Sequence, residues 1–119
     1  MAAQFAFVPH SGPYARGIHA TVQAVLKHPL DSEQLLARLR NFYAASPFVQ
    51  VGATPPRLKD VIASNYARLG AVSDGRTIAV MSVADNLNKG AAGGALQWMN
   101  RLLGFPESTG LTAPAAGWT

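Results

Sequence analysis

Residues Asp85–Asn100 read D-N-L-N-K-G-A-A-G-G-A-L-Q-W-M-N and join a run with strand character, residues 77–84, to a helix with an apolar face. Glycine lets the backbone approach a neighbour closely, and the start of a helix offers unpaired N–H groups to an acceptor. The junction therefore suits contact with a polar ligand or with another domain, although ordinary strand-to-helix turns carry glycine as well. Its polar and glycine residues are Asp85, Asn86, Asn88, Lys89, Gly90, Gly93 and Gly94.

Length and composition indicate one domain with a partly covered surface. The chain has 119 residues, enough to bury a core without disulfides. Charged residues make up only 13 %, whereas a soluble domain usually carries about a quarter. We therefore expect a partner to cover some of the surface. The net charge of +4 is scattered along the chain, which argues against binding of nucleic acid.

Several classes of protein and site are not expected. No apolar run approaches the roughly 20 residues that a membrane-spanning helix needs. Met1-Ala2-Ala3-Gln4 lacks the basic start of a signal peptide, so the cytoplasm is the expected location. The chain has no cysteine, which excludes a disulfide framework and a thiolate metal site. The spacing of its three histidines does not favour zinc, and we expect no metal.

The hydrophobic pattern predicts the element order β-β-α-β-β-β-α. We expect an α+β fold with a mainly antiparallel, mixed sheet covered by two longer helices. Pro9 and Pro29 are each expected to end a strand, and 73–76 is expected to form a hairpin turn. Residue 118, a tryptophan, is expected to need a partner or to stay loosely held. The predicted strands cover residues 4–8, 17–27, 48–51, 61–72 and 77–83.

The two predicted helices have clear end signals. Asp31 is placed to cap the first helix, and Gln34 completes a capping-box pattern. The second helix is expected to run from about Lys89 to Leu103, with Gly104 just after its end. Its expected inward-facing residues are Ala92, Ala95, Leu96, Met99, Leu102 and Leu103.

The junction resembles the signature of a known family. D-N-L-x-K-G-A-A-G-x-A-x-Q-x-M-N is similar to the C-terminal domain of N-acetyl-gamma-glutamyl-phosphate reductases, which are NADPH-dependent enzymes of arginine biosynthesis. Aspartate-semialdehyde dehydrogenases share a similar K-G-A-A helix start, and they remain an alternative together with reductases of a carrier-bound aminoadipate phosphate. Further blocks follow in the family's order: F-V-P-H at 7–10, R-G-I-x-A-T-V at 16–22, P-F-V-x-V at 47–51, L-K-D-V-x-x-S-N at 58–65 and G-F-P-E-S-T-G-L at 104–111.

The resemblance implies that residues 1–119 are the C-terminal substrate and dimerisation domain of a semialdehyde dehydrogenase or GAPDH-like enzyme. The N-terminal nucleotide-binding (Rossmann) domain, which carries the family's catalytic cysteine, is absent. No catalytic residue is therefore expected in this chain, and the chain alone is expected to be inactive. The implied partners are the missing domain, further copies of the chain and a small-molecule acyl phosphate. A non-catalytic assembly module remains an alternative.

By resemblance, the cofactor-binding residues are Asn86, Leu87, Lys89 and Gly90, which are expected beside the nicotinamide end of NADP. The alternative is that Asp85 caps the helix and that Lys89 is solvated.

The predicted substrate-binding residues are Arg16 and His10. Arginine binds carboxylate or phosphate groups through parallel hydrogen bonds, although Arg16 could instead pair with an acidic side chain. The chain also departs from the family's pattern, because Ala63 stands where the family ordinarily has glycine.

Overall fold

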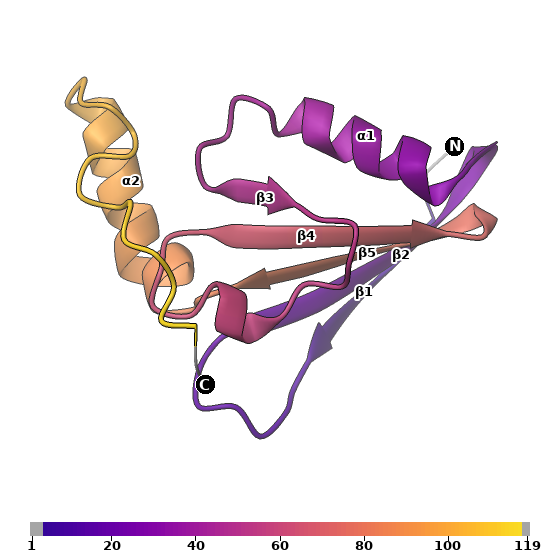
Figure 1. The fold of residues 1–119 in the computed structure, drawn as a ribbon, viewed down its shortest axis with the longest axis horizontal. Helices are drawn as coiled ribbons and strands as arrows, with labels where there is room; N and C mark the ends of the chain where they lie inside the picture. Colours follow the sequence, from indigo (N-terminus) through magenta and orange to yellow (C-terminus); the bar gives the residue numbers. More distant parts are fainter. Residues whose placement is uncertain (1–3, 118–119) are drawn as a thin grey trace.

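The fold is built on a five-stranded sheet in the order β1-β2-β5-β4-β3 (Figure 1), in a computed structural model that describes residues 4–117. Strands β3 and β4 are parallel, and all other neighbours are antiparallel. The predicted α+β class with a mainly antiparallel, mixed sheet is therefore confirmed, while Trp118 lies outside the described residues. The strands are β1 (Phe5–His10), β2 (Ile18–Leu30), β3 (Val49–Val51), β4 (Ala67–Ser73) and β5 (Gly75–Ala84).

Helix α1 (Ser32–Phe42) packs over β3 and β4 (Figure 1). The predicted capping box is present. The Asp31 carboxylate accepts from the Gln34 backbone at 2.7 Å, and the Gln34 side chain accepts from the Asp31 backbone at 3.2 Å. Buried Leu35 and Leu36 form the main cluster under this helix. They pack with Ala71, and with the partly buried Leu39, Val51, Ile78 and Val80.

Both strand-ending prolines lie inside strands, so those two boundary predictions were wrong. Strand β1 continues through Pro9 to His10, and β2 continues through Pro29 to Leu30. Strand β1 is an edge strand, where a residue without N–H is tolerated. In β2, regular pairing with β5 shifts between Val25 and Leu30, so Pro29 occupies an irregular part of the ladder.

Residues 61–72 do not form the single strand that the sequence predicted. A short 3-10 helix, η1 (Leu58–Asp60), leads into a turn, and β4 starts only at Ala67. Val61 and Ile62 are buried in the turn, which explains the apolar pattern that suggested a strand. Ala63 has a φ of 63°, a left-handed conformation that no regular strand contains.

The second helical segment begins as a π-helix, η2 (Asn88–Ala92), and continues as α2 (Gly93–Leu102). Gly104 follows with a φ of 76°, as the end signal predicted. Helix α2 stands beside the end of the sheet rather than over it (Figure 1). Consequently Met99 and Leu102 are 46 % and 81 % exposed, and the prediction that they face inward was wrong for this chain. It was also wrong for Ala92, Ala95 and Leu103, which are exposed as well. No helix within residues 4–117 combines the length and apolar character needed to cross a membrane.

Candidate functional site

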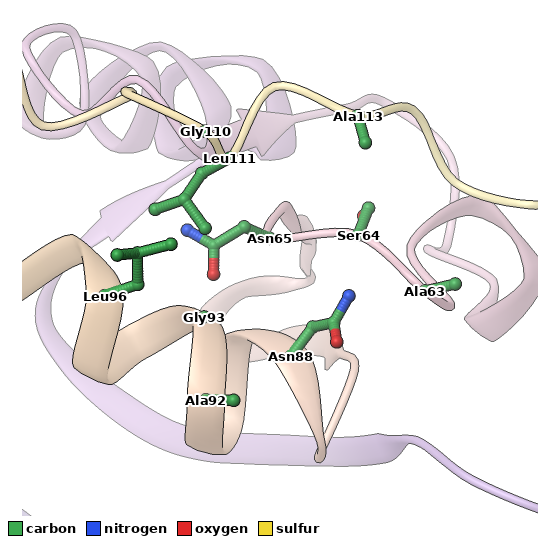
Figure 2. A pocket seen from close by; sticks show the side chains of 10 residues that line it. All are labelled: Ala63, Ser64, Asn65, Asn88, Ala92, Gly93, Leu96, Gly110, Leu111 and Ala113. Atoms are coloured by element: carbon green, nitrogen blue, oxygen red, sulfur yellow. The ribbon is translucent and has the colours of Figure 1, made fainter.

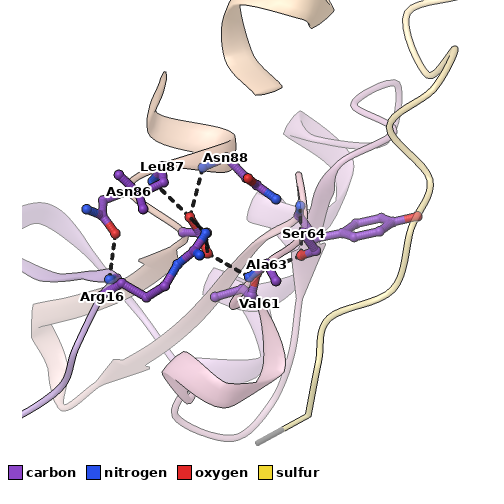
Figure 3. Close-up of polar contacts among 10 residues, drawn as sticks. Arg16, Val61, Ala63, Ser64, Asn86, Leu87 and Asn88 are labelled. Atoms are coloured by element: carbon purple, nitrogen blue, oxygen red, sulfur yellow. Dashed lines mark hydrogen bonds and ion pairs between the residues drawn. The ribbon is translucent and has the colours of Figure 1, made fainter. Parts of the chain in front are cut away.

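Asp85 lies at the centre of the junction between β5 and η2, and its side chain is fully buried. Its carboxylate accepts the backbone N–H groups of Leu87 and Asn88 at 2.8 Å each and that of Ala63 at 2.6 Å (Figure 3). The Nη2 atom of Arg16 lies 2.7 Å from Oδ1 and 2.6 Å from Oδ2. Three separate segments of the chain therefore meet on one carboxylate.

The charge of Asp85 is stabilised by these donors. Burial by itself raises the pKa of this carboxyl, but the hydrogen bonds from Arg16 and from the backbone of Asn88, Ala63 and Leu87 outweigh it and lower the pKa to about 2. Asp85 is therefore charged at neutral pH and caps the start of the helical segment, as the sequence alternative described.

Arg16, a predicted substrate-binding residue, is tied to Asp85 and also borders open space. The guanidinium contacts Asp85 through Nη2, while its buried Nε has no hydrogen-bond partner among the described residues. The side chain is partly exposed and lines a cavity of about 650 Å³. Its role in substrate binding stays a prediction. The other lining residues are Pro13, Tyr14, Ala15, Ile62, Ala63 and Ala116.

The predicted cofactor turn is open on its outer side. Leu87 is 53 % exposed, and Gly90 is exposed as well. The Oδ1 atom of Asn86 accepts from the Gly17 backbone at 2.7 Å (Figure 3), which leaves the Nδ2 group of Asn86 as a donor. The turn can therefore meet a neighbouring domain or a ligand. Cofactor binding by these residues stays a prediction.

Lys89 belongs to a partly buried polar network, so the alternative that it is simply solvated was wrong. Its Nζ donates to the Gln97 side chain at 2.6 Å and lies 5.5 Å from the centre of the Phe48 ring. Burial lowers the pKa of Lys89, and the nearby charge of Glu107 acts in the opposite direction. Gln97 also accepts from Asn65 at 3.0 Å and donates to Glu107.

His10, the other predicted substrate-binding residue, lies exposed at the end of β1. Its ring stacks on that of His19 at 4.5 Å between centroids, and its Nε2 lies 2.8 Å from the Thr21 hydroxyl. The hydroxyl of Tyr14, a residue of the Arg16 cavity, donates to the His10 carbonyl at 2.5 Å. His10 is thus linked to the rim of that cavity, and its substrate role stays a prediction.

A second cavity of about 230 Å³ lies beside the π-helix, between the turn at 63–65 and the C-terminal segment (Figure 2). Asn65 is almost fully buried at its edge, and a Cβ atom on Gly93 would lie only 2.5 Å from the Asn65 Oδ1. The contact between Asn65 and this glycine was not predicted from the sequence. The signal was available, because a glycine within a predicted helix often marks a close approach. No group of three metal-ligating side chains gathers among the described residues.

The fold and the junction define the class to which the chain belongs. A mainly antiparallel sheet leads into an open, glycine-rich turn and a helix with exposed apolar side chains. A family model described as "Semialdehyde dehydrogenase, dimerisation domain" matches residues 1–86. The chain belongs to this family, which confirms the resemblance seen in the sequence.

Within this family, the chain is similar to proteins named N-acetyl-gamma-glutamyl-phosphate reductase. An N-acetyl-gamma-glutamyl-phosphate reductase from Symbiobacterium thermophilum is 50 % identical over 109 residues, which cover 88 % of this chain and 31 % of that protein. The reductase of the same name from Streptococcus gordonii is 48 % identical over 101 residues, covering 83 % of this chain and 30 % of that protein. The chain therefore spans about a third of the length of the curated relatives that it matches.

A solved structure shares the fold of this chain. A crystal structure of aspartate semialdehyde dehydrogenase II from Vibrio cholerae is similar with a TM-score of 0.58 and 25 % sequence identity. The match covers 74 % of this chain and 27 % of that chain.

Proposed function

We propose that this chain is the C-terminal part of an enzyme that reduces N-acetyl-gamma-glutamyl phosphate to the semialdehyde with NADPH, in arginine biosynthesis. The observation that carries the proposal is the 50 % identity to a reductase of that name over 88 % of this chain. Aspartate semialdehyde is the second candidate product, favoured by the likeness to the Vibrio cholerae enzyme, but the identity there is only 25 %. A cytoplasmic location remains a prediction of the sequence.

The placement of this chain's residues supports the following proposed roles. When bound, NADPH supplies a hydride. The chain has no cysteine, so a thiol nucleophile has to come from the nucleotide-binding part, and the chain alone is expected to be inactive. The free guanidinium N–H groups of Arg16 would bind an anionic group of the substrate, with His10 at the rim.

The open turn fits a cofactor in two ways. Asn86 keeps its Nδ2 group as a donor, and the exposed Gly90 has no side chain to hinder approach. Leu87 offers an exposed apolar surface beside them. Lys89 is held close by through Gln97. We assign these residues to the nicotinamide end of NADP.

The nucleotide-binding part is proposed to dock on α2. The cofactor turn and α2 are continuous in the chain, so a domain that brings the cofactor to the turn comes close to the start of this helix. The apolar side chains that α2 leaves exposed are suited to such a contact. They include Trp98, Met99 and Leu102 on α2, and the exposed Leu103 and Phe105 follow directly after the helix.

A second copy of the chain is proposed to bind elsewhere, on the part of the sheet formed by β1 and β2. Phe5 and Phe7 are 67 % and 60 % exposed there, and the family is described as a dimerisation domain. The two apolar surfaces can be separated by mutation. Leu102→Glu is expected to prevent binding of a separately produced nucleotide-binding part and to preserve self-association, whereas Phe7→Glu should do the reverse. Asn41→Glu, on the exposed side of α1, serves as the control. If either single variant lost both interactions, the proposal that the two partners bind to separate surfaces would be contradicted.

Turnover assays test the proposed reaction. The chain alone and the chain joined to its nucleotide-binding part are compared on the phosphates of N-acetylglutamate, aspartate and carrier-bound aminoadipate. Reduction is expected for the joined protein with the N-acetylglutamyl compound. Turnover by the isolated chain, or preference for either other substrate, would overturn the proposal.

A further inference from the structure

We propose that Asp85 is a positioning residue that couples Arg16 to the turn 86–90, so that substrate and cofactor sites keep a fixed relation. This inference rests on the proposed function. The proposed reaction uses Arg16 and the turn 86–90, both of which contact Asp85, but gives Asp85 itself no role. Its carboxylate is fully buried, so direct contact with a ligand is excluded in this structure.

The coupling begins where the sheet ends. The last pair of the β2–β5 ladder is Ile18 with Ala84. Beyond it, Asn86 accepts from the Gly17 backbone at 2.7 Å, and Asp85 accepts from Arg16. Side chains therefore continue the pairing of the two segments past the end of the ladder.

The contact with Arg16 is not the geometry expected of a pair optimised for stability. Arginine can meet a carboxylate with two parallel N–H groups, but here Nη2 alone reaches both oxygens of Asp85. The buried Nε is left without a partner in the described chain, which costs stability. Because Asp85 holds only the Nη2 atom of Arg16, the rest of the guanidinium stays at the wall of the 650 Å³ cavity.

The Asp85 carboxylate also holds the turn 86–90 and part of the cavity wall in place through hydrogen bonds. Its Oδ1 accepts from the backbone of Leu87 and Asn88, while its backbone carbonyl accepts from Gly90 at 2.8 Å. Its Oδ2 accepts from Ala63, which lines the Arg16 cavity. A shift of the turn is therefore transmitted to the guanidinium, and a shift of the guanidinium to the turn.

Asp85→Asn tests this coupling, because asparagine keeps the shape but places an N–H₂ group against Arg16 and against either the Ala63 N–H or the N–H groups of Leu87 and Asn88. In the joined enzyme we expect the KM for the acyl phosphate and the Kd for NADPH each to rise about tenfold, the effect of losing one charged hydrogen bond. Arg16→Lys is expected to raise the KM alone. The double variant should resemble Asp85→Asn, because Arg16 is already released.

Asp60→Asn is the matched control, because Asp60 also pairs with two arginines, Arg57 and Arg68, at 3.0 and 2.9 Å. It is expected to leave KM and Kd unchanged. If Asp85→Asn lowers only the melting temperature, with KM and Kd as in the wild type, Asp85 is merely structural and the inference fails.

Hydrogen exchange of the chain itself separates this inference from the proposed function. The Gly17 amide bonds to Asn86 and not to Asp85. Its exchange is expected to accelerate about tenfold in Asp85→Asn, through loss of the coupled contacts, and to be unchanged in Asp60→Asn. Unchanged Gly17 exchange in Asp85→Asn would overturn the coupling. If the joined wild-type enzyme fails to reduce the N-acetylglutamyl compound while Gly17 responds, only the proposed function fails.

Discussion

Arg16 and Asp85 are 69 residues apart in the sequence, yet Nη2 of one lies 2.6 Å from Oδ2 of the other. The donors around Asp85 lower its pKa from 3.8 to about 2. Because the folded pKa is the lower one, this carboxylate stabilises the fold above about pH 4 and loses that contribution as the pH falls towards 2.

The first prediction is therefore a specific loss of acid stability. The shift corresponds to about 2 kcal/mol of unfolding free energy at neutral pH. Urea unfolding of the wild type between pH 7 and pH 2 should show this loss, and Asp85→Asn should lack most of it. Asp60→Asn should retain most of it, although the pKa of Asp60 is also lowered, first by its hydrogen bond with Arg57. Equal acid sensitivity of wild type and Asp85→Asn would contradict the assignment.

The second prediction concerns Ala63, whose φ of 63° is unfavourable for a residue with a Cβ atom. Ala63→Gly is expected to increase the unfolding free energy by about 0.5–1 kcal/mol, the relief of strain less the greater entropy of the unfolded glycine. The matched control is Ala37→Gly, exposed within α1, which should lose about 1 kcal/mol. Destabilisation by both substitutions would show that Ala63 is not strained.

Ala63 also illustrates what the sequence could and could not predict. Alanine stands here in place of the family's usual glycine, and the sequence pattern predicted a strand where the structure forms a turn. The turn depends on a hydrogen bond to Asp85, 22 residues away, and no local pattern contains that information. The capping box at Asp31 and the helix end at Gly104 were predicted correctly, since both are decided by residues within one helical turn.

The α2 error has a different cause. The apolar spacing of α2 predicted a buried face, but that face is exposed in this chain, because such a pattern carries no information on what would cover it. In this chain Leu102 remains exposed, and under the proposed function the missing partner is the nucleotide-binding part. The assignment of the turn 86–90 to a cofactor rests on the family resemblance and stays a prediction. Its π-helical geometry, which the sequence did not predict, depends on i to i+5 bonds such as Ala92 N–H to Leu87 O at 3.0 Å.

The third prediction separates two glycines of the π-helical region. A Cβ atom on Gly93 would lie 2.5 Å from Asn65 Oδ1 and 2.9 Å from the Asn88 carbonyl. Gly93→Ala is therefore expected to lower the unfolding free energy by about 2 kcal/mol, although alanine is the better helix former. At Gly90 the nearest atoms lie at 3.4 and 3.5 Å, so Gly90→Ala should retain stability but weaken NADPH binding in the joined enzyme. Urea unfolding and cofactor titration measure the two effects. Equal stability loss in both variants would contradict the distinction.

The last prediction uses the buried position of Lys89. Burial lowers its pKa, so its charged form is disfavoured in the fold. This cost is present at neutral pH and is relieved as the pH rises through the folded pKa towards 10.5, the ordinary value. Methionine at this position keeps the contact with Phe48, and Gln97 still accepts from Asn65.

Lys89→Met is therefore expected to unfold at the same or higher urea concentration than the wild type at pH 7, with the difference shrinking at alkaline pH. In the joined enzyme its NADPH affinity should fall about tenfold if Lys89 serves the cofactor, the effect of one charged hydrogen bond. Lys59→Met, an exposed lysine outside the junction, should change neither quantity. Lower stability with unchanged NADPH affinity would mean that Lys89 connects the turn to Gln97 and does not touch the cofactor. A contact within the chain contributes to the unfolding free energy but not to the binding of NADPH.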